Sequence, residues 1–187
     1  MRTPMVINLR GTSGSGKSTI VRRLMDLYPR KDPFFVTGRK RPMAYGCHRS
    51  GGRSLWVVGH YETACGGCDT INGMETIYGL IREAIEMGYD VIFEGLIVAS
   101  DVVRCVSLKE QGLLVLELDT TIDICVQSIQ ARRDARGDER QLNDGNTRYK
   151  MKCIAAQRPR FLSAGVDFRV INREDAFTLC KEKLGWT

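Results

Sequence analysis

Short apolar runs alternate with amphipathic segments along most of this chain of 187 residues. Each run has the length of a buried β-strand, and the segments between the runs carry apolar residues mostly at helical spacing. Strands that alternate with helices in this way predict a mostly parallel sheet with helices on both faces. We therefore expect an α/β fold of three layers, α/β/α, formed by residues 1–187 as a single domain.

The predicted elements follow one another with short connections. Apolar runs predict strands at residues 5–9, 34–37, 55–61, 89–95, 113–119 and 166–171. Amphipathic spacing predicts helices at residues 18–27, 74–87, 101–111, 121–136, 147–162 and 173–184. Thr121 is expected to cap one of these helices. Residues 38–54 are basic and rich in glycine, so we interpret them as a functional loop or a mobile insertion.

A phosphate-binding motif stands between the first predicted strand and the first predicted helix. Residues 11–18, GTSGSGKS, fit the pattern G-x-x-x-x-G-K-[ST]. The glycines let backbone N–H groups point inward, and the following helix turns the positive end of its dipole toward phosphate. Lys17 can reach the β- and γ-phosphates, and the Ser18 hydroxyl can bind Mg²⁺. The motif predicts a nucleoside triphosphate bound by Gly11, Thr12, Ser13, Gly14, Ser15, Gly16, Lys17, Ser18 and Thr19.

Acidic residues end two of the predicted strands. Glu94 closes the strand at 89–95, and Asp119 closes the strand at 113–119. Because ligands of parallel sheets bind beyond the carboxyl ends of the strands, we expect both acids to gather near the phosphate-binding loop. There Glu94 would hold a metal, together with Ser18, or position a nucleophile. The alternative is an exposed carboxylate at a strand end with no such role.

Arginines gather on the predicted helix at 121–136. Arg132, Arg133 and Arg136 share one helix face, and Arg140 follows. Arginine is always charged and binds phosphate oxygens in pairs, so we expect an arginine-bearing lid at residues 132–147. Arg132 and Arg136 are its candidate catalytic residues, and Arg132 would also contact the nucleotide. Acidic residues are interleaved with these arginines, so ordinary ion pairing on the surface is the alternative.

The positive charge of the chain is concentrated in one segment. The formal net charge is +6, and residues 22–53 contain nine basic residues but only two acidic ones. A basic excess beside a phosphate site favours a polyanionic substrate, although a solvated basic face is an equal alternative. No apolar run is long enough to span a membrane, and the N-terminus does not resemble a signal peptide. The odd number of seven cysteines favours reduced thiols in a cytosol.

A C-x-x-C sequence, Cys65 to Cys68, precedes Asp69. Structural zinc requires four ligands, usually from two such pairs, and the chain holds no second C-x-x-C. We therefore favour a glycine-rich turn that shapes a pocket and directs Asp69 into it, over a metal or redox site. Asp69 is then a candidate general base for a substrate hydroxyl. A turn-forming aspartate without a chemical role is the alternative.

Residues 11–19 together with an arginine-bearing lid resemble the P-loop kinases that phosphorylate small hydroxyl substrates and nucleotides, such as gluconate, shikimate and nucleoside monophosphate kinases. More narrowly, the chain resembles a group of bacteriophage P-loop kinases that includes the 5-hydroxymethyluridine DNA kinases. The segments that carry this narrower resemblance are residues 57–62, 65–69, 93–96, 118–120, 132–133 and 143–146.

The resemblance implies a P-loop kinase fold that uses ATP and Mg²⁺. It implies phosphorylation of the hydroxymethyl group of 5-hydroxymethyluracil in phage DNA, a step toward hypermodified thymine in the host cytoplasm. The candidate catalytic residues are Lys17, Glu94, Asp69, Arg132 and Arg136.

The basic residues, in an insertion at about 30–70, would bind the DNA backbone. Tyr45, Trp56 and Tyr61 would offer a stacking surface to an extruded base. The candidate substrate-binding residues are Arg39, Lys40, Arg41, Arg49, Tyr61 and Asp69. Two alternatives stay open. One is a kinase of a free nucleotide or a small hydroxyl metabolite, and the other is a nucleotide-binding, DNA-associated module that transfers no phosphate.

Overall fold

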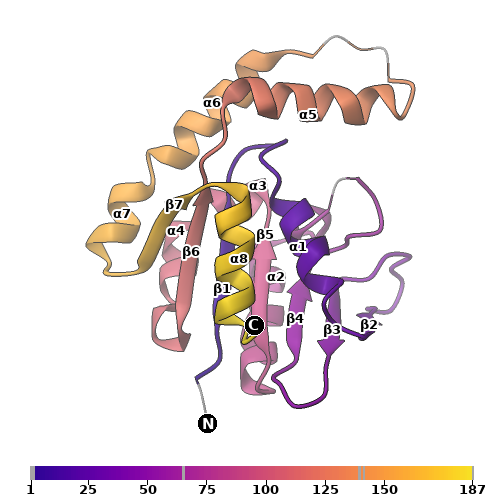
Figure 1. Cartoon of the computed structure of the whole chain (residues 1–187), viewed down its shortest axis with the longest axis vertical. Helices are drawn as coiled ribbons and strands as arrows, with labels where there is room; N and C mark the ends of the chain where they lie inside the picture. Colours follow the sequence, from indigo (N-terminus) through magenta and orange to yellow (C-terminus); the bar gives the residue numbers. More distant parts are fainter. Residues whose placement is uncertain (1–2, 65, 139, 141, 187) are drawn as a thin grey trace.

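A seven-stranded sheet runs through the centre of the molecule in the order β2-β3-β4-β5-β1-β6-β7 (Figure 1). The computed structural model describes residues 3–64, 66–138, 140 and 142–186. Within them the strands are β1 (Val6–Arg10), β2 (Arg30–Phe34), β3 (Ala44–His48), β4 (Leu55–Val58), β5 (Asp90–Glu94), β6 (Leu113–Leu118) and β7 (Asp167–Ile171). The helices are α1 (Lys17–Met25), α2 (Met74–Glu86), α3 (Leu96–Ala99), α4 (Val102–Val106), α5 (Ile122–Asp134), α6 (Asp144–Ala155), α7 (Arg158–Ser163) and α8 (Arg173–Lys183), with 3-10 turns η1 (Cys68–Thr70) and η2 (Lys109–Gln111).

Most of the sheet is parallel. β4 pairs with β5, β5 with β1, β1 with β6, and β6 with β7, all in parallel. β2 and β3 extend the sheet in antiparallel pairing at the β4 edge. The predicted mostly parallel sheet is therefore confirmed.

Helices cover both faces of this sheet. Successive side chains of a strand point to opposite faces of the sheet. Ile7 and Leu9 of β1 pack with α1 and α8 on one face, whereas Val6 packs with α2 and α4 on the other. Figure 1 shows α1 and α8 on one side of the strands and α2 and α4 on the other. This arrangement confirms the predicted α/β/α layers.

The antiparallel edge differs from the prediction. The second strand covers Arg30–Phe34 instead of residues 34–37, and the stretch expected to be irregular, 38–54, contains β3. β3 reads AYGCH, which has no clear strand pattern, but it pairs with β2 on one side and β4 on the other. Tertiary pairing, which local sequence does not encode, thus determines this strand.

Two predicted helices are interrupted. Residues 101–111 form α4 and then the turn η2, and the helix expected at 147–162 begins earlier and splits into α6 and α7. Asn143 starts α6, because its side chain accepts a hydrogen bond of 3.0 Å from the Gly145 N–H. Pro159 stands in the first turn of α7, where a missing N–H is tolerated. As expected, Thr121 caps α5 by accepting from the Ile124 N–H.

Helices α5 and α6 lie beyond the carboxyl ends of the parallel strands, over the loop that follows β1 (Figure 1). This position gives α5 direct access to the region where the predicted ligands of the sheet would bind. In the described part of the chain, no helix combines the length and the apolar character that a bilayer span requires.

Candidate active site

The loop between β1 and α1 lines a cavity of about 530 Å³ at the carboxyl ends of the parallel strands. The walls come from this loop, Ala64, Gly66, Asp69 and Thr70 after β4, the end of β5, helix α5 and the first residue of α8. Of the predicted nucleotide-binding residues, this cavity is lined by Ser13, Gly14, Gly16, Lys17, Ser18 and Thr19. Gly11, Thr12 and Ser15 line a separate cavity of about 80 Å³, together with Asp119, so this strand-end acid does not face the larger cavity.

Close packing around the loop requires two of its glycines. Gly14 has φ 80° and lies against α5, where a Cβ atom would stand 2.3 Å from the Cys125 carbonyl oxygen. Gly16 has φ 99°, and its Cβ would stand 2.8 Å from the Arg173 Nε atom. Both positions therefore need glycine for backbone direction, and Gly14 also needs it for space, because its neighbour is backbone and not a movable side chain.

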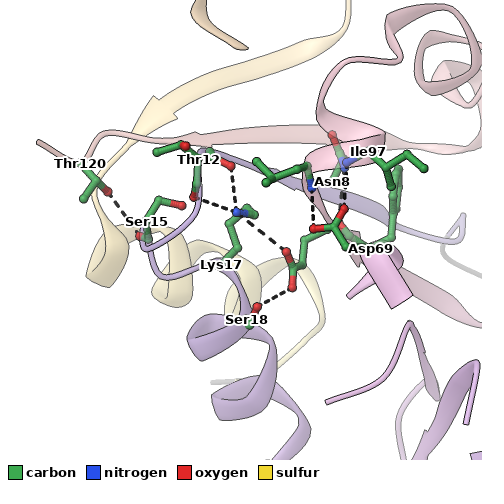
Figure 2. Close-up of polar contacts among 12 residues, drawn as sticks. Asn8, Thr12, Ser15, Lys17, Ser18, Asp69, Ile97 and Thr120 are labelled. Carbon is green, nitrogen blue, oxygen red and sulfur yellow. Dashed lines mark hydrogen bonds and ion pairs between the residues drawn. The ribbon is translucent and has the colours of Figure 1, made fainter. Parts of the chain in front are cut away.

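Lys17 is buried at the base of the cavity. Its Nζ atom donates hydrogen bonds to the carbonyl oxygens of Gly11 (2.8 Å) and Thr12 (3.0 Å) and lies 4.0 Å from Glu94 Oε2 (Figure 2). Burial lowers the pKa of Lys17, and the carboxylate of Glu94 opposes this change. The ammonium group is thus aimed into the loop where phosphates would lie.

Glu94 and Ser18 bring two oxygen atoms together on the cavity wall. The Ser18 hydroxyl donates a hydrogen bond of 2.7 Å to Glu94 Oε1 (Figure 2). Burial raises the pKa of Glu94, while Lys17 and this hydrogen bond favour the ionised form. A hydroxyl and a carboxylate are hard ligands that suit Mg²⁺. The described residues form no group of three or more His, Cys, Asp or Glu placed to hold a metal.

Asp69 lies exposed on the same cavity wall, at the turn η1. Its carboxylate accepts hydrogen bonds of 2.9 Å from the N–H groups of Leu96 and Ile97, at the start of α3 (Figure 2). These bonds fix the carboxylate between η1 and the end of β5. A carboxylate oxygen has two lone pairs, so the same side chain can hold the backbone and also accept a proton.

The predicted lid arginines separate into two groups. Arg132 lines the cavity, and its Nε atom donates to the Ser128 carbonyl oxygen (3.1 Å). Arg136 is exposed one turn further along, donates to the Arg132 carbonyl oxygen (3.1 Å) and does not line the cavity. The structure brings Arg132 to the site and leaves Arg136 outside it. The predicted lid segment 132–147 also includes residues 139 and 141, which lie outside the described part of the chain.

Arg173 is a cavity residue that the sequence did not identify. Its guanidinium donates to the carbonyl oxygens of Ser15 (2.8 Å) and Gly14 (3.1 Å). Arg22 of α1 also lines the cavity, and it donates to the carbonyl oxygens of Tyr61 (3.0 Å) and Thr63. Arg173 and Ser15 are 158 positions apart in the sequence, so no local pattern could reveal their contact.

The cations of residues 39–41 lie beside this cavity. Arg39, Lys40 and Arg41 line a neighbouring cavity of about 420 Å³ together with Asp69 and Thr70, which also line the larger one. The Arg39 guanidinium donates to the Thr70 carbonyl oxygen (2.7 Å). Lys40 and Arg41 are exposed. Three predicted substrate-binding cations thus border Asp69.

Arg49 lies elsewhere. Its guanidinium donates to the carbonyl oxygens of Leu184 (2.6 Å) and Gly185 (3.1 Å), at the end of α8, and stacks 4.2 Å from the Trp186 ring centroid. Cations near the carboxyl end of a helix satisfy its free carbonyl groups. This predicted substrate contact is instead a helix cap.

The expected aromatic stacking surface is not formed. Trp56, Tyr45 and Tyr61 are each less than a tenth exposed. Trp56 packs against the rings of Phe34 and Tyr89 in the core. Tyr61 is held by a hydrogen bond from its hydroxyl to the Val58 carbonyl oxygen (3.4 Å), so its ring is part of the scaffold beneath the cavity.

The glycine-rich turn after β4 packs against Glu94, a candidate catalytic residue. A Cβ atom on Gly67 would stand 2.6 Å from Glu94 Oε1, so glycine allows this close approach. Cys68 is fully buried, and burial raises the pKa of its thiol. Cys65 lies outside the described residues. The geometry of Gly67 favours the interpretation of this segment as a turn that shapes the pocket.

Comparison with known proteins gives full-length matches to phage enzymes. No family model matches the sequence. A 5-hmdU DNA kinase of Pseudomonas phage PaMx11 is 44% identical over 187 residues, which cover 98% of this chain and 99% of the relative. A 5-hmdU DNA kinase of Pseudomonas phage M6 is 26% identical in an alignment that covers 91% of this chain and 92% of the relative. A 5-hmdU DNA kinase of Delftia phage PhiW-14 is 43% identical over 70 residues, which cover 37% of this chain and 24% of the relative.

Proposed function

This chain belongs to the family of 5-hmdU DNA kinases, and we propose that it transfers the γ-phosphate of ATP to 5-hydroxymethyluracil in DNA. The hydroxymethyl oxygen attacks the γ-phosphorus, the bond from that phosphorus to the bridging oxygen of ADP breaks, and a carboxylate takes the hydroxyl proton. The observation that carries the proposal is the single cavity in which Lys17, Ser18, Glu94 and Asp69 meet.

The phosphate donor is assigned to the loop between β1 and α1. Backbone N–H groups at residues 13–19 cradle the phosphates, while Lys17 and Arg132 neutralise charge on the transferring group. Lys17 needs only to exchange its bonds to the Gly11 and Thr12 carbonyl oxygens for phosphate oxygens. Ser18 and Glu94 would hold Mg²⁺, which neutralises phosphate charge when it is bound.

The acceptor is assigned to the part of the cavity that the turn η1 lines. Asp69 faces the cavity with its carboxylate fixed by the N–H groups of Leu96 and Ile97, so it can orient the acceptor hydroxyl and take its proton. Arg39, Lys40 and Arg41 border the same carboxylate and would bind the flanking DNA phosphates. The relatives are phage proteins, so the proposed reaction takes place in the cytoplasm of the host cell.

Transfer of labelled γ-phosphate from ATP to three acceptors tests this proposal. The acceptors are DNA that contains 5-hydroxymethyluracil, the same DNA with thymine, and the free 5-hydroxymethyl nucleotide. We expect label in the first acceptor alone. Label in the free nucleotide alone would identify a nucleotide kinase, and label in none would reject phosphate transfer to this hydroxyl.

The variant Lys17→Ala connects the activity to the cavity. It removes the buried ammonium group that now bonds to the Gly11 and Thr12 carbonyl oxygens and that would neutralise phosphate charge. Phosphate transfer should therefore fall by about a hundredfold or more. Thermal unfolding close to that of the wild type would show that the fold is intact. Transfer at the wild-type rate would contradict the assignment of the donor site.

A further inference from the structure

Three consecutive apolar side chains are exposed beside the cations of residues 39–41. Phe34, Phe35 and Val36 have 37%, 51% and 41% of their surface exposed. The ring of Phe34 packs against Trp56, with centroids 5.5 Å apart, whereas Phe35 forms no aromatic contact within the described part of the chain. Adjacent exposed apolar side chains beside a group of cations are a candidate surface for contact with a partner.

The loop that carries these side chains is ordered by backbone hydrogen bonds. The Arg39 N–H donates to the Val36 carbonyl oxygen (3.0 Å) across a turn in which Gly38 has φ 83°. The Met43 N–H donates to the Phe34 carbonyl oxygen (2.8 Å) and closes the base of the loop. Phe35 and Val36 are therefore presented to solvent by a defined turn.

One contact ties this loop to the active-site wall. The Arg39 guanidinium donates to the Thr70 carbonyl oxygen (2.7 Å), and Thr70 follows Asp69 in η1. Residues 34–43 contain three cations and no acid. The DNA duplex has negatively charged phosphates on its outside and stacked aromatic bases inside. A basic loop with exposed apolar side chains is complementary to both features.

The position of Lys17 sets a geometric requirement on the substrate. Lys17 is only 6% exposed, so the transferring phosphate lies at the base of the cavity. A base stacked inside a duplex cannot bring its hydroxymethyl group to that depth, and enzymes that act on bases extrude the nucleotide. Apolar side chains such as Phe and Leu can insert between the base steps of a duplex and unstack them.

On the basis of the proposed function, we propose that Phe35, supported by Val36, enters the base stack and replaces the extruded 5-hydroxymethyluracil, while Arg39, Lys40 and Arg41 hold the flanking phosphates. The partner of this surface is double-stranded DNA. Phe35 is a positioning residue, because it acts on the stack and not on the reacting atoms.

The test compares Phe35→Ala with the wild type on two substrates. One is a duplex in which 5-hydroxymethyluracil is paired with adenine and lies next to 2-aminopurine, whose fluorescence rises on unstacking. The other is the single strand, in which extrusion needs no disruption of pairing. For Phe35→Ala we expect kcat/KM to fall about tenfold or more on the duplex and to stay near the wild-type value on the single strand. The fluorescence rise on binding the duplex should also be lost. Phe35→Leu should keep most of both signals, because leucine can also fill the stack.

Leu162→Ala is the matched control, because Leu162 is an exposed apolar residue (60%) on α7, at the opposite edge of the molecule in Figure 1. Unchanged activity of Phe35→Ala on the duplex, or an equal loss on duplex and single strand, would overturn the proposal that Phe35 enters the base stack. A contact with another protein in place of DNA would give the first of these results. If the wild type phosphorylates neither substrate, the proposed function fails, and the fluorescence rise on binding still decides whether Phe35 enters the stack.

Discussion

Replacing Arg173 with alanine should weaken ATP binding without unfolding the protein. The side chain donates two hydrogen bonds to the outside of the phosphate-binding loop, to the carbonyl oxygens of Ser15 (2.8 Å) and Gly14 (3.1 Å). A buried hydrogen bond from a charged group contributes about 1.5–3 kcal/mol. Arg173 is half-buried, and water can replace its guanidinium, so the pair should contribute about 1–2 kcal/mol in total.

Because about 1.4 kcal/mol corresponds to a tenfold change, the KM for ATP should rise roughly 5- to 30-fold. Lysine carries one compact ammonium and cannot bridge both carbonyl oxygens, so Arg173→Lys should lie between the wild type and Arg173→Ala. The assay is steady-state transfer with the DNA acceptor saturating and the concentration of ATP varied. Arg169→Ala is the matched control, because Arg169 pairs with Asp167 on β7 (2.9 Å) and lines neither the cavity nor the loop.

An unchanged KM for ATP in Arg173→Ala, in a protein that thermal unfolding shows to be folded, would refute this role of Arg173. An equal rise in the KM for DNA would also refute it, because Arg173 bonds to Ser15 and Gly14 of the proposed donor loop.

Three further predictions follow from the geometry of the site and its surroundings. Arg132→Ala should lower kcat by about a hundredfold or more in the transfer assay. Arg136 lies one turn outside the cavity, so Arg136→Ala should stay within a few-fold of the wild type. Equal losses in the two variants would contradict this difference between the two arginines. Gly14→Ala places a Cβ 2.3 Å from a carbonyl oxygen of α5 at φ 80°, so denaturant unfolding should show a loss of about 1–3 kcal/mol, and an unchanged midpoint would exclude this close contact. Burial lowers the pKa of His60 below 6.5, so the unfolded chain binds a proton that the folded protein does not. The free energy of unfolding should therefore decrease as the pH falls below about 6.5, by at most about 1.4 kcal/mol per pH unit, and His60→Gln should remove this contribution; an unaltered pH profile in that variant would contradict it.

The sequence predicted what is encoded locally. The phosphate-binding loop is a run of consecutive residues, and the apolar runs of β1, β5 and β6 stand out because parallel strands are buried on both faces. Their carboxyl ends meet at one edge, which is why Glu94 and the loop were expected together. The resemblance to the phage kinases, drawn from segments across most of the chain, is confirmed by the full-length relatives.

The remaining features depend on contacts between distant parts of the chain. β3 becomes a strand only because β2 and β4 flank it, and Arg173 meets the loop across 158 positions. Arg49 shows the opposite error. It belongs to a basic run in the sequence, yet folding carries it to the end of α8. A run of basic residues in the sequence does not reveal which of their side chains lie near one another in the folded protein.

Asp69 and Thr70 form a wall common to the donor cavity and the cavity of residues 39–41. Arg39 holds that wall through the Thr70 carbonyl oxygen, and Asp69 holds the start of α3 through two N–H groups. A ligand that shifts the wall from one side therefore alters the other side. Thermodynamic linkage then requires that the factor by which ATP changes the affinity for DNA equals the factor by which DNA changes the affinity for ATP. The coupling free energy between the two proposed substrates should accordingly be the same whichever of them binds first.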